Sequence, residues 1–175
     1  MIKIKSFILC LFFPIVLYGK GILQDTIMIH VNKQVYELMT SVDTVMDGCN
    51  SRYSVLHVKL TKNGIIVGEN VFPLSGSCPI EEDISVKGFD NGFIIRIPYC
   101  DGYLFRFGEA RFVYSKGQDD FILTAYEEEI IDRQHPELDV KVVKYNICAE
   151  VPIVLSTFSV VEIRNNTDNK RLNLP

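Results

Sequence analysis

The chain has 175 residues, of which 47% are apolar, 11% aromatic and 23% charged. This length and composition suit one globular domain with a hydrophobic core, and they exclude a disordered, collagen-like or coiled-coil chain. The formal net charge is −4. A net acidic surface repels phosphate groups, so binding to nucleic acid or to anionic lipid is disfavoured.

Residues 1–21 have the three parts of a secretory signal peptide. Lys3 and Lys5 precede an apolar run over residues 7–18, and small residues follow it. This run is too short to cross a bilayer, which takes roughly 20 helical residues. We expect cleavage after Gly21, with cleavage after Gly19 as the alternative, and a mature protein that is periplasmic or secreted. Cleavage after Gly21 removes three lysines and no acid, which leaves 15 basic and 22 acidic side chains.

Four cysteines remain once Cys10 is removed with the leader: Cys49, Cys78, Cys100 and Cys148. An even number of cysteines in a secreted chain predicts two disulfides. Their wide spacing fits no zinc motif, because zinc sites use closely spaced cysteine pairs. Four cysteines allow three pairings, and the favoured one joins Cys78 to Cys100 and Cys49 to Cys148.

Residues 33–47 are predicted to form an amphipathic helix. Their apolar side chains recur at steps of three and four, which places them on one helical face. The residues of this face are Val35, Leu38, Met39, Val42, Val45 and Met46. Asn32 is placed to cap the start of the helix, and Gly48 is placed to end it.

After Cys49 the hydrophobic pattern changes to a period of two, which is typical of strands with one buried face. Turn signals such as Asn63-Gly64 and Asn91-Gly92 separate these segments. The predicted strands cover residues 54–60, 65–71, 84–89, 93–99, 103–107, 110–114, 121–126, 140–147 and 157–163. The sequence thus predicts a single α+β domain over 22–164: mainly an antiparallel meander with one N-terminal amphipathic helix, stapled by disulfides. A polar C-terminal tail covers 165–175.

Residues 53–123 carry a pattern of turns and strands that extends beyond simple alternation. It includes the Asn63-Gly64 turn, the segments Asn91-Gly92-Phe93-Ile94-Ile95 and Arg111-Phe112-Val113-Tyr114, and Asp119-Asp120-Phe121-Ile122-Leu123. In this pattern the chain resembles a family of small exported bacterial proteins that have no assigned biochemical activity. The resemblance implies a β-rich fold and a periplasmic or secreted location. It implies no catalytic or binding residue.

No catalytic or metal-binding motif stands out, and no cofactor is expected. His30, His57 and His135 form no zinc motif, and the chain has no phosphate-binding loop and no nucleophile elbow. Glu127, Glu129 and Asp132 form a candidate acidic docking patch for a basic partner. The commoner interpretation of such a cluster is a solvated strand edge that discourages pairing.

The absence of a recognisable set of catalytic or metal-binding residues favours an exported, non-enzymatic binding protein of the bacterial envelope. An inhibitor or immunity-type protein that blocks a protein partner is one form of this hypothesis. The alternatives are a small exported hydrolase that uses His57 or His135 with a carboxylate, and a structural envelope component. The mature chain is expected to have no membrane span and to bind no nucleic acid; its oligomeric state stays open.

Overall fold

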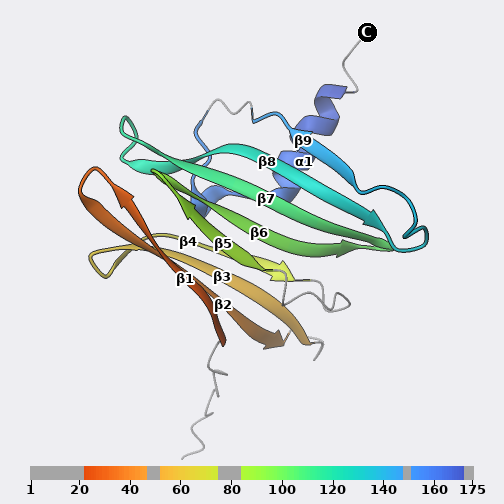
Figure 1. Ribbon diagram of the computed structural model, residues 1–175, viewed down its shortest axis with the longest axis horizontal. Coiled ribbons are helices and arrows are strands. Elements are labelled where there is room, and N and C mark those ends of the chain that lie inside the picture. Colours follow the sequence, from red (N-terminus) through yellow and green to blue (C-terminus); the bar gives the residue numbers. More distant parts are fainter. Residues whose placement is uncertain (1–21, 47–51, 75–83, 148–150, 172–175) are drawn as a thin grey trace, which may run out of the picture.

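The computed structural model describes residues 22–46, 52–74, 84–147 and 151–171, and the structural statements below concern these residues. Within them the chain forms two antiparallel sheets that stack on one another (Figure 1). Each sheet is a meander, because every strand pairs with the strand that precedes it in the sequence. The first half of the chain builds one sheet, and the second half builds the other.

The first sheet contains β1 (Ile22–Val31), β2 (Gln34–Met46), β3 (Arg52–Lys62) and β4 (Ile65–Leu74) in that order. Two-residue turns join β1 to β2 and β3 to β4. Asn32 and Lys33 have φ values of 46° and 68°, and Asn63 and Gly64 have φ values of 52° and 76°. Positive φ at both central residues is the geometry of the hairpin turns that match strand twist.

The second sheet contains five strands in sequence order. They are β5 (Ser85–Phe89), β6 (Gly92–Asp101), β7 (Leu104–Ser115), β8 (Asp120–Asp132) and β9 (Lys141–Tyr145). The pairing of β7 with β8 shifts register between Arg111 and Phe112. This irregularity decides which β8 side chains face inward after Leu123.

A 3-10 turn (Leu155–Thr157) and helix α1 (Val160–Arg171) follow β9. The segment before α1 links the two sheets on one side, because the Leu123 amide donates to the Ile153 carbonyl at 2.7 Å and Asn70 donates to the Leu155 carbonyl at 2.7 Å. On the other side β1 lies next to β5, where the Val86 amide donates to Asp25 Oδ2 at 3.4 Å.

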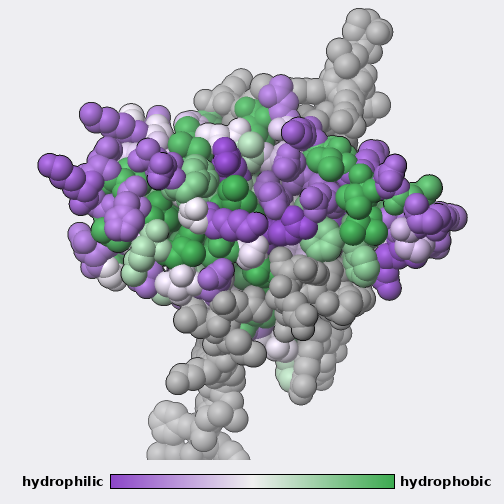
Figure 2. Space-filling view, in the orientation of Figure 1, coloured by the Kyte–Doolittle hydropathy of each residue, from purple (hydrophilic) through white to green (hydrophobic). Residues whose placement is uncertain are grey.

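The core lies between the sheets and is dominated by aromatic rings. Phe93, Phe112, Phe121 and Tyr126 are the largest fully buried side chains. Phe93 stacks on Phe112 with ring centroids 5.1 Å apart and packs against Phe121 at 5.2 Å. Such pairs add to the stabilisation from apolar burial alone. Outside the core, hydrophilic and hydrophobic side chains are interspersed over the face shown in Figure 2.

The predicted N-terminal helix is wrong, because residues 34–46 form strand β2. Tyr36, Leu38, Thr40 and Val42 are all buried, which is the period of two of a strand that buries one face. The sequence pattern hid this period because Thr40 counts as polar. Its hydroxyl is satisfied inside the protein by donating to the Asp25 carbonyl at 3.4 Å. The fold is therefore mostly antiparallel sheet, and its α-helix lies at the C-terminal end of the described chain.

The last predicted strand, over 157–163, is also wrong. Its residues form the end of the 3-10 turn and the start of α1, which extends to Arg171 through the residues assigned to the polar tail. Phe158 and Ile163 are buried in the core, but Phe158 directly follows the 3-10 turn and Ile163 lies in α1, so neither belongs to a strand.

No disulfide joins two described residues, because Cys100 is the only cysteine among them, and the predicted pairings stay predictions. Cys49, Cys78 and Cys148 lie outside the described residues. Cys100 lies near the end of β6 and is not a free thiol.

Candidate functional site

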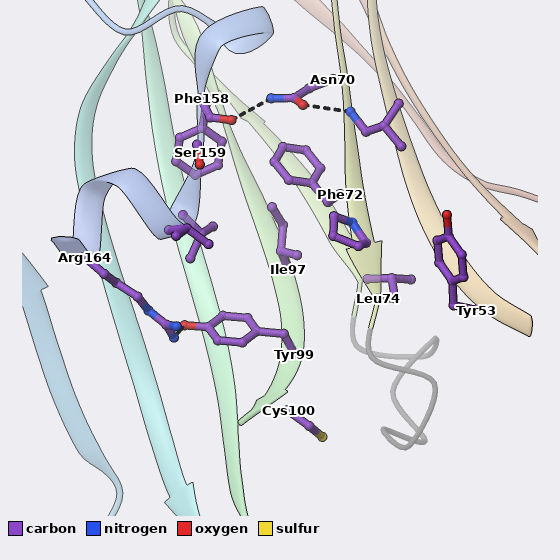
Figure 3. Close-up of a pocket in the computed structure, with 14 residues that line it drawn as sticks. Tyr53, Asn70, Phe72, Leu74, Ile97, Tyr99, Cys100, Phe158, Ser159 and Arg164 are labelled. Atoms are coloured by element: carbon purple, nitrogen blue, oxygen red, sulfur yellow. Dashed lines mark hydrogen bonds between the residues drawn. The ribbon is translucent and has the colours of Figure 1, made fainter. Parts of the chain in front are cut away.

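A cavity of about 700 Å³ lies between the sheets, at the end where β4 and β6 finish. The start of β3, the second half of β4, the end of β6 and the beginning of α1 form its walls. Figure 3 shows the side chains that line it, which come from β3, β4, β6 and the segment that runs into α1. The labelled members are Asn70, Phe158 and Ser159 at one end, Phe72, Ile97 and Leu74 along the middle, and Tyr53, Tyr99, Cys100 and Arg164 toward the other end.

The cavity has a buried floor and an exposed rim. Phe72, Ile97 and Phe158 are almost completely buried and form the floor. Val71 and Val161 are 48% and 62% exposed and lie at the rim. Apolar side chains dominate both parts, so the cavity offers a hydrophobic interior that a molecule from solution can enter.

Asn70 positions the wall that α1 contributes. Its side-chain amide donates to the Leu155 carbonyl at 2.7 Å and to the Phe158 carbonyl at 2.8 Å, while its oxygen accepts from the Val71 amide (Figure 3). These bonds give the Phe158 carbonyl a side-chain donor, and they give the Leu155 carbonyl a second donor beside the Phe158 amide, which lies 3.3 Å from it. Asn70 thereby fixes the start of α1 against the edge of the first sheet.

A buried ionic network stands beside the cavity, beneath α1. Its centre is Glu128 on β8, whose side chain is fully buried. Arg164 of α1 donates to both carboxylate oxygens, from Nε to Oε1 at 2.8 Å and from Nη2 to Oε2 at 3.2 Å. Arg106 of β7 donates to Oε2 at 3.1 Å. Arg164 therefore ties the C-terminal helix to the second sheet through a charge-assisted pair with two hydrogen bonds.

Tyrosine hydroxyl groups complete the shell around the carboxylate. Tyr126 donates to Oε1 at 2.9 Å, and Tyr145 donates to Oε2 at 3.0 Å. Tyr99, which lines the cavity, accepts a hydrogen bond from Arg164, and its ring lies 4.4 Å from the guanidinium carbon. Because every carboxylate oxygen has at least two donors, the charge of Glu128 is compensated despite its burial.

Tyr126 is held against β7 because Gly108 has no side chain. A Cβ at Gly108 would lie 2.4 Å from the Tyr126 hydroxyl oxygen, well inside contact distance. Burial and the neighbouring Glu128 carboxylate both disfavour the phenolate, so the pKa of Tyr126 is raised far above its ordinary value. The hydroxyl therefore acts as a hydrogen-bond donor throughout the neutral range.

The residues of the predicted acidic patch lie on β8, where Glu127 and Glu129 are paired on both sides and Asp132 lies beyond the pairing with β9. β8 pairs with β7 on one side and with β9 on the other. Glu127 Oε2 lies 3.7 Å from Lys144 Nζ, Glu129 Oε2 lies 2.7 Å from Arg96 Nη2, and Asp132 accepts from the Gln134 amide at 2.8 Å. The three carboxylates have local partners, and none of them lines the cavity. Their role as a docking patch stays a prediction.

Arg96 on β6 links its strand to β7 and β8 on the outer face of the second sheet. It bonds to Glu109 at 2.8 Å and to Glu129 at 2.7 Å, and its guanidinium carbon lies 4.8 Å from the Phe107 ring centroid. Partial burial alone would lower the pKa of Arg96, but its hydrogen bonds to Glu129 and Glu109 outweigh burial and raise it. This face is organised by cross-strand ion pairs.

The two histidines considered for catalysis lie apart from each other and from the cavity. His57 Nε2 on β3 is 3.2 Å from Asp43 Oδ2 on β2, and His135 Nδ1 is 3.4 Å from Glu137 Oε1 in an exposed loop. Neither histidine lines the cavity. Within the described ranges, no cluster of three or more histidine, cysteine or acidic side chains could hold a metal ion.

The sequence alone does not reveal the cavity and the Glu128 network, because their members lie far apart in the chain. Arg164 and Glu128 are 36 positions apart, and Asn70 and Phe158 are 88 apart. One local signal existed. Glu128 follows Tyr126 by two residues, so in a strand both side chains point to the same face, and a buried Tyr126 predicts an inward carboxylate.

Together, these features define an antiparallel two-sheet protein with an apolar interior cavity that is walled on one side by a C-terminal helix. Comparison of the chain with protein-family models, curated proteins and solved structures gave no match. The resemblance to a family of exported proteins stays a prediction. Among the described helices, none is long and apolar enough to cross a membrane.

Proposed function

We propose that this chain is an exported, non-enzymatic binding protein of the bacterial envelope, and that a small hydrophobic ligand occupies the cavity beside α1. The leader-like segment at residues 1–21 supports export. The cavity narrows the kind of partner, because its size and its lining suit a small molecule better than a protein surface. An inhibitor of a protein partner is therefore the less favoured form of the binding hypothesis.

The cavity itself is the observation that carries the proposal. Pockets that enclose one small ligand have volumes of roughly 300–1,000 Å³ and are mostly apolar with a few polar groups. This cavity has a volume of about 700 Å³, and Asn70, Tyr99, Ser159 and Arg164 bring polar atoms to a lining that is otherwise mostly apolar. The Arg164–Glu128 pair and the Asn70 hydrogen bonds hold α1 in place, so the wall of the cavity is formed before any ligand arrives.

The proposal is tested by titrating the purified protein with a neutral apolar fluorophore, N-phenyl-1-naphthylamine. We expect saturable binding at one site per chain. Val161→Trp places an indole at the rim of the cavity, where the native side chain is 62% exposed and a larger group can be accommodated. We expect this variant to bind at least tenfold more weakly.

Val142→Trp is the matched control, because Val142 is 52% exposed on β9 and does not line the cavity. It should bind the fluorophore as the native protein does. Equal affinity in both variants, or no saturable binding in the native protein, would refute the proposal.

A hydrolase that uses His57 is a second candidate, favoured by one observation. Asp43 lies 3.2 Å from the His57 imidazole, and Ser41 is the cross-strand neighbour of His57. A serine, a histidine and a carboxylate are the groups that nucleophilic hydrolysis requires. The test is a screen with activated esters on the native protein, His57→Ala and Ser41→Ala. Turnover that both substitutions abolish would favour the hydrolase over the binding protein.

A further inference from the structure

We infer that the ligand carries an unbranched aliphatic chain and that the cavity accommodates about ten carbons of it. This inference rests on the proposed function, since it names the class of ligand for the same cavity. It is argued from the length of the cavity, the state of the aromatic rings that line it and the charges beside it.

The cavity is elongated along β4. Asn70, Phe72 and Leu74 are alternate residues of one strand, and all three line it in a row (Figure 3). Five strand residues span about 13 Å from first to last at ~3.3 Å per residue. Carbon–carbon bonds of about 1.5 Å advance an extended chain by ~1.25 Å per carbon, so this length holds roughly ten carbons.

The rings of Phe72, Phe158 and Tyr99 in the lining already have partners, which favours an aliphatic ligand over a flat aromatic one. Phe158 packs against Phe72 at 5.7 Å, against Phe112 at 5.6 Å and against Tyr126 at 5.7 Å between ring centroids. The Arg164 guanidinium lies over the Tyr99 ring. The remaining lining is largely aliphatic and makes non-directional contacts, which suit a flexible methylene chain. Its aliphatic members are Val71, Pro73, Leu74, Ile97, Val160 and Val161.

The charge beside the cavity is already neutralised. Arg164 is the cationic residue of the described lining, and it makes two hydrogen bonds to the fully buried Glu128. A ligand anion would have to displace a buried carboxylate that other donors also hold, so it gains little from Arg164. The polar head of the ligand should therefore lie at the rim in water, and its charge should matter little.

The test is isothermal titration of the purified protein with two ligand series, below their aggregation concentrations. One series contains straight-chain fatty acids of 6, 8, 10, 12 and 14 carbons, and the other contains the matching monoacylglycerols. Burial of one methylene contributes ~0.8 kcal/mol, which corresponds to about a fourfold gain in affinity. We expect this gain per carbon up to ten to twelve carbons and no further gain beyond, with similar slopes for both series. Val161→Trp should weaken both series, and Val142→Trp should not.

Any one of four results would overturn the inference. Affinity that does not depend on chain length excludes burial of the chain. Affinity that keeps rising through 14 carbons, or that is unchanged by Val161→Trp, indicates association with a surface and not with this bounded cavity. Binding of N-phenyl-1-naphthylamine at the Val161-sensitive site without binding of either series refutes the aliphatic ligand and leaves the proposed function standing. If neither probe binds, the proposed function fails as well.

Discussion

Replacing Glu128 by Gln should destabilise the protein more than any other single change to an ionisable side chain of the described residues. The substitution keeps the size of the side chain but removes the charge that receives five hydrogen bonds. Glutamine has one acceptor oxygen, and its amino group would face donors from Arg106, Arg164 or a tyrosine. Arg106 and Arg164 then lose the charge of Glu128, although their side chains are only 16% and 23% exposed. Arg106 keeps an ion pair with Asp101 at 3.2 Å.

Removing one partner of a buried ion pair costs about 3–5 kcal/mol. With a urea dependence of ~2 kcal/mol per molar, the unfolding midpoint should fall by roughly 2 M. Because the chain has no tryptophan, unfolding is followed by circular dichroism and tyrosine fluorescence. Glu127→Gln is the matched control on the same strand: its side chain is 42% exposed and lies 3.7 Å from Lys144, so it should cost less than about 1 kcal/mol. Equal midpoints for the two variants would show that the Glu128 network does not stabilise the fold.

Three further predictions concern the surroundings of this network. Gly108→Ala should lower the free energy of unfolding by about 1–3 kcal/mol, because the added Cβ would clash with the Tyr126 hydroxyl. Gly117→Ala is the control, because no atom lies within 4 Å of a Cβ there, and its unfolding midpoint in urea should stay close to the native value. The raised pKa of Tyr126 predicts that the contribution of this residue to the free energy of unfolding is constant below about pH 10 and falls above it. Above that pH the unfolded chain ionises the tyrosine, while the folded chain keeps it protonated. Unfolding midpoints measured from pH 8 to 11 should fall less steeply in Tyr126→Phe, and identical slopes would contradict the assignment. Asn70→Ala should cost about 1–3 kcal/mol, because the Phe158 carbonyl loses its side-chain donor and the Leu155 carbonyl keeps only the Phe158 amide. Asn146→Ala, at an exposed position, should change stability little. A difference below about 0.5 kcal/mol between the two variants would contradict the role of Asn70 as a tie between α1 and β4.

Much of the sheet could be predicted because its strands bury one face and its turns use residues that tolerate positive φ. The predicted strand over 93–99 is confirmed by β6, in which the alternate residues Phe93, Ile95 and Ile97 are all buried. The Asn63-Gly64 turn is confirmed by the hairpin of β3 and β4. In these segments the local pattern and the tertiary structure agree, so reading along the chain is sufficient.

The prediction failed where a residue's environment differed from its chemical type. Thr40 is polar but buried, so the alternation along β2 was interpreted as a helical stripe. Glu128 lies between two other glutamates, and a run of three acids is typical of a solvated segment. The pairing of β8 with β7, and the burial of Tyr126 two residues earlier, show that the middle one faces inward. The cavity depends on contacts across the whole chain, such as that of Asn70 with Phe158, and the order of residues does not reveal them.

The most direct test of the central claim is to locate a bound ligand by methyl NMR. Spectra of the protein labelled with ¹³C at its isoleucine, leucine and valine methyl groups would be recorded during titration with decanoic acid. The account predicts saturable shifts at the methyl groups of Leu74, Ile97 and Val161, which line the cavity, and none at Val142. Shifts confined to exposed methyl groups such as that of Val142, or no saturable shift at the cavity residues, would contradict it.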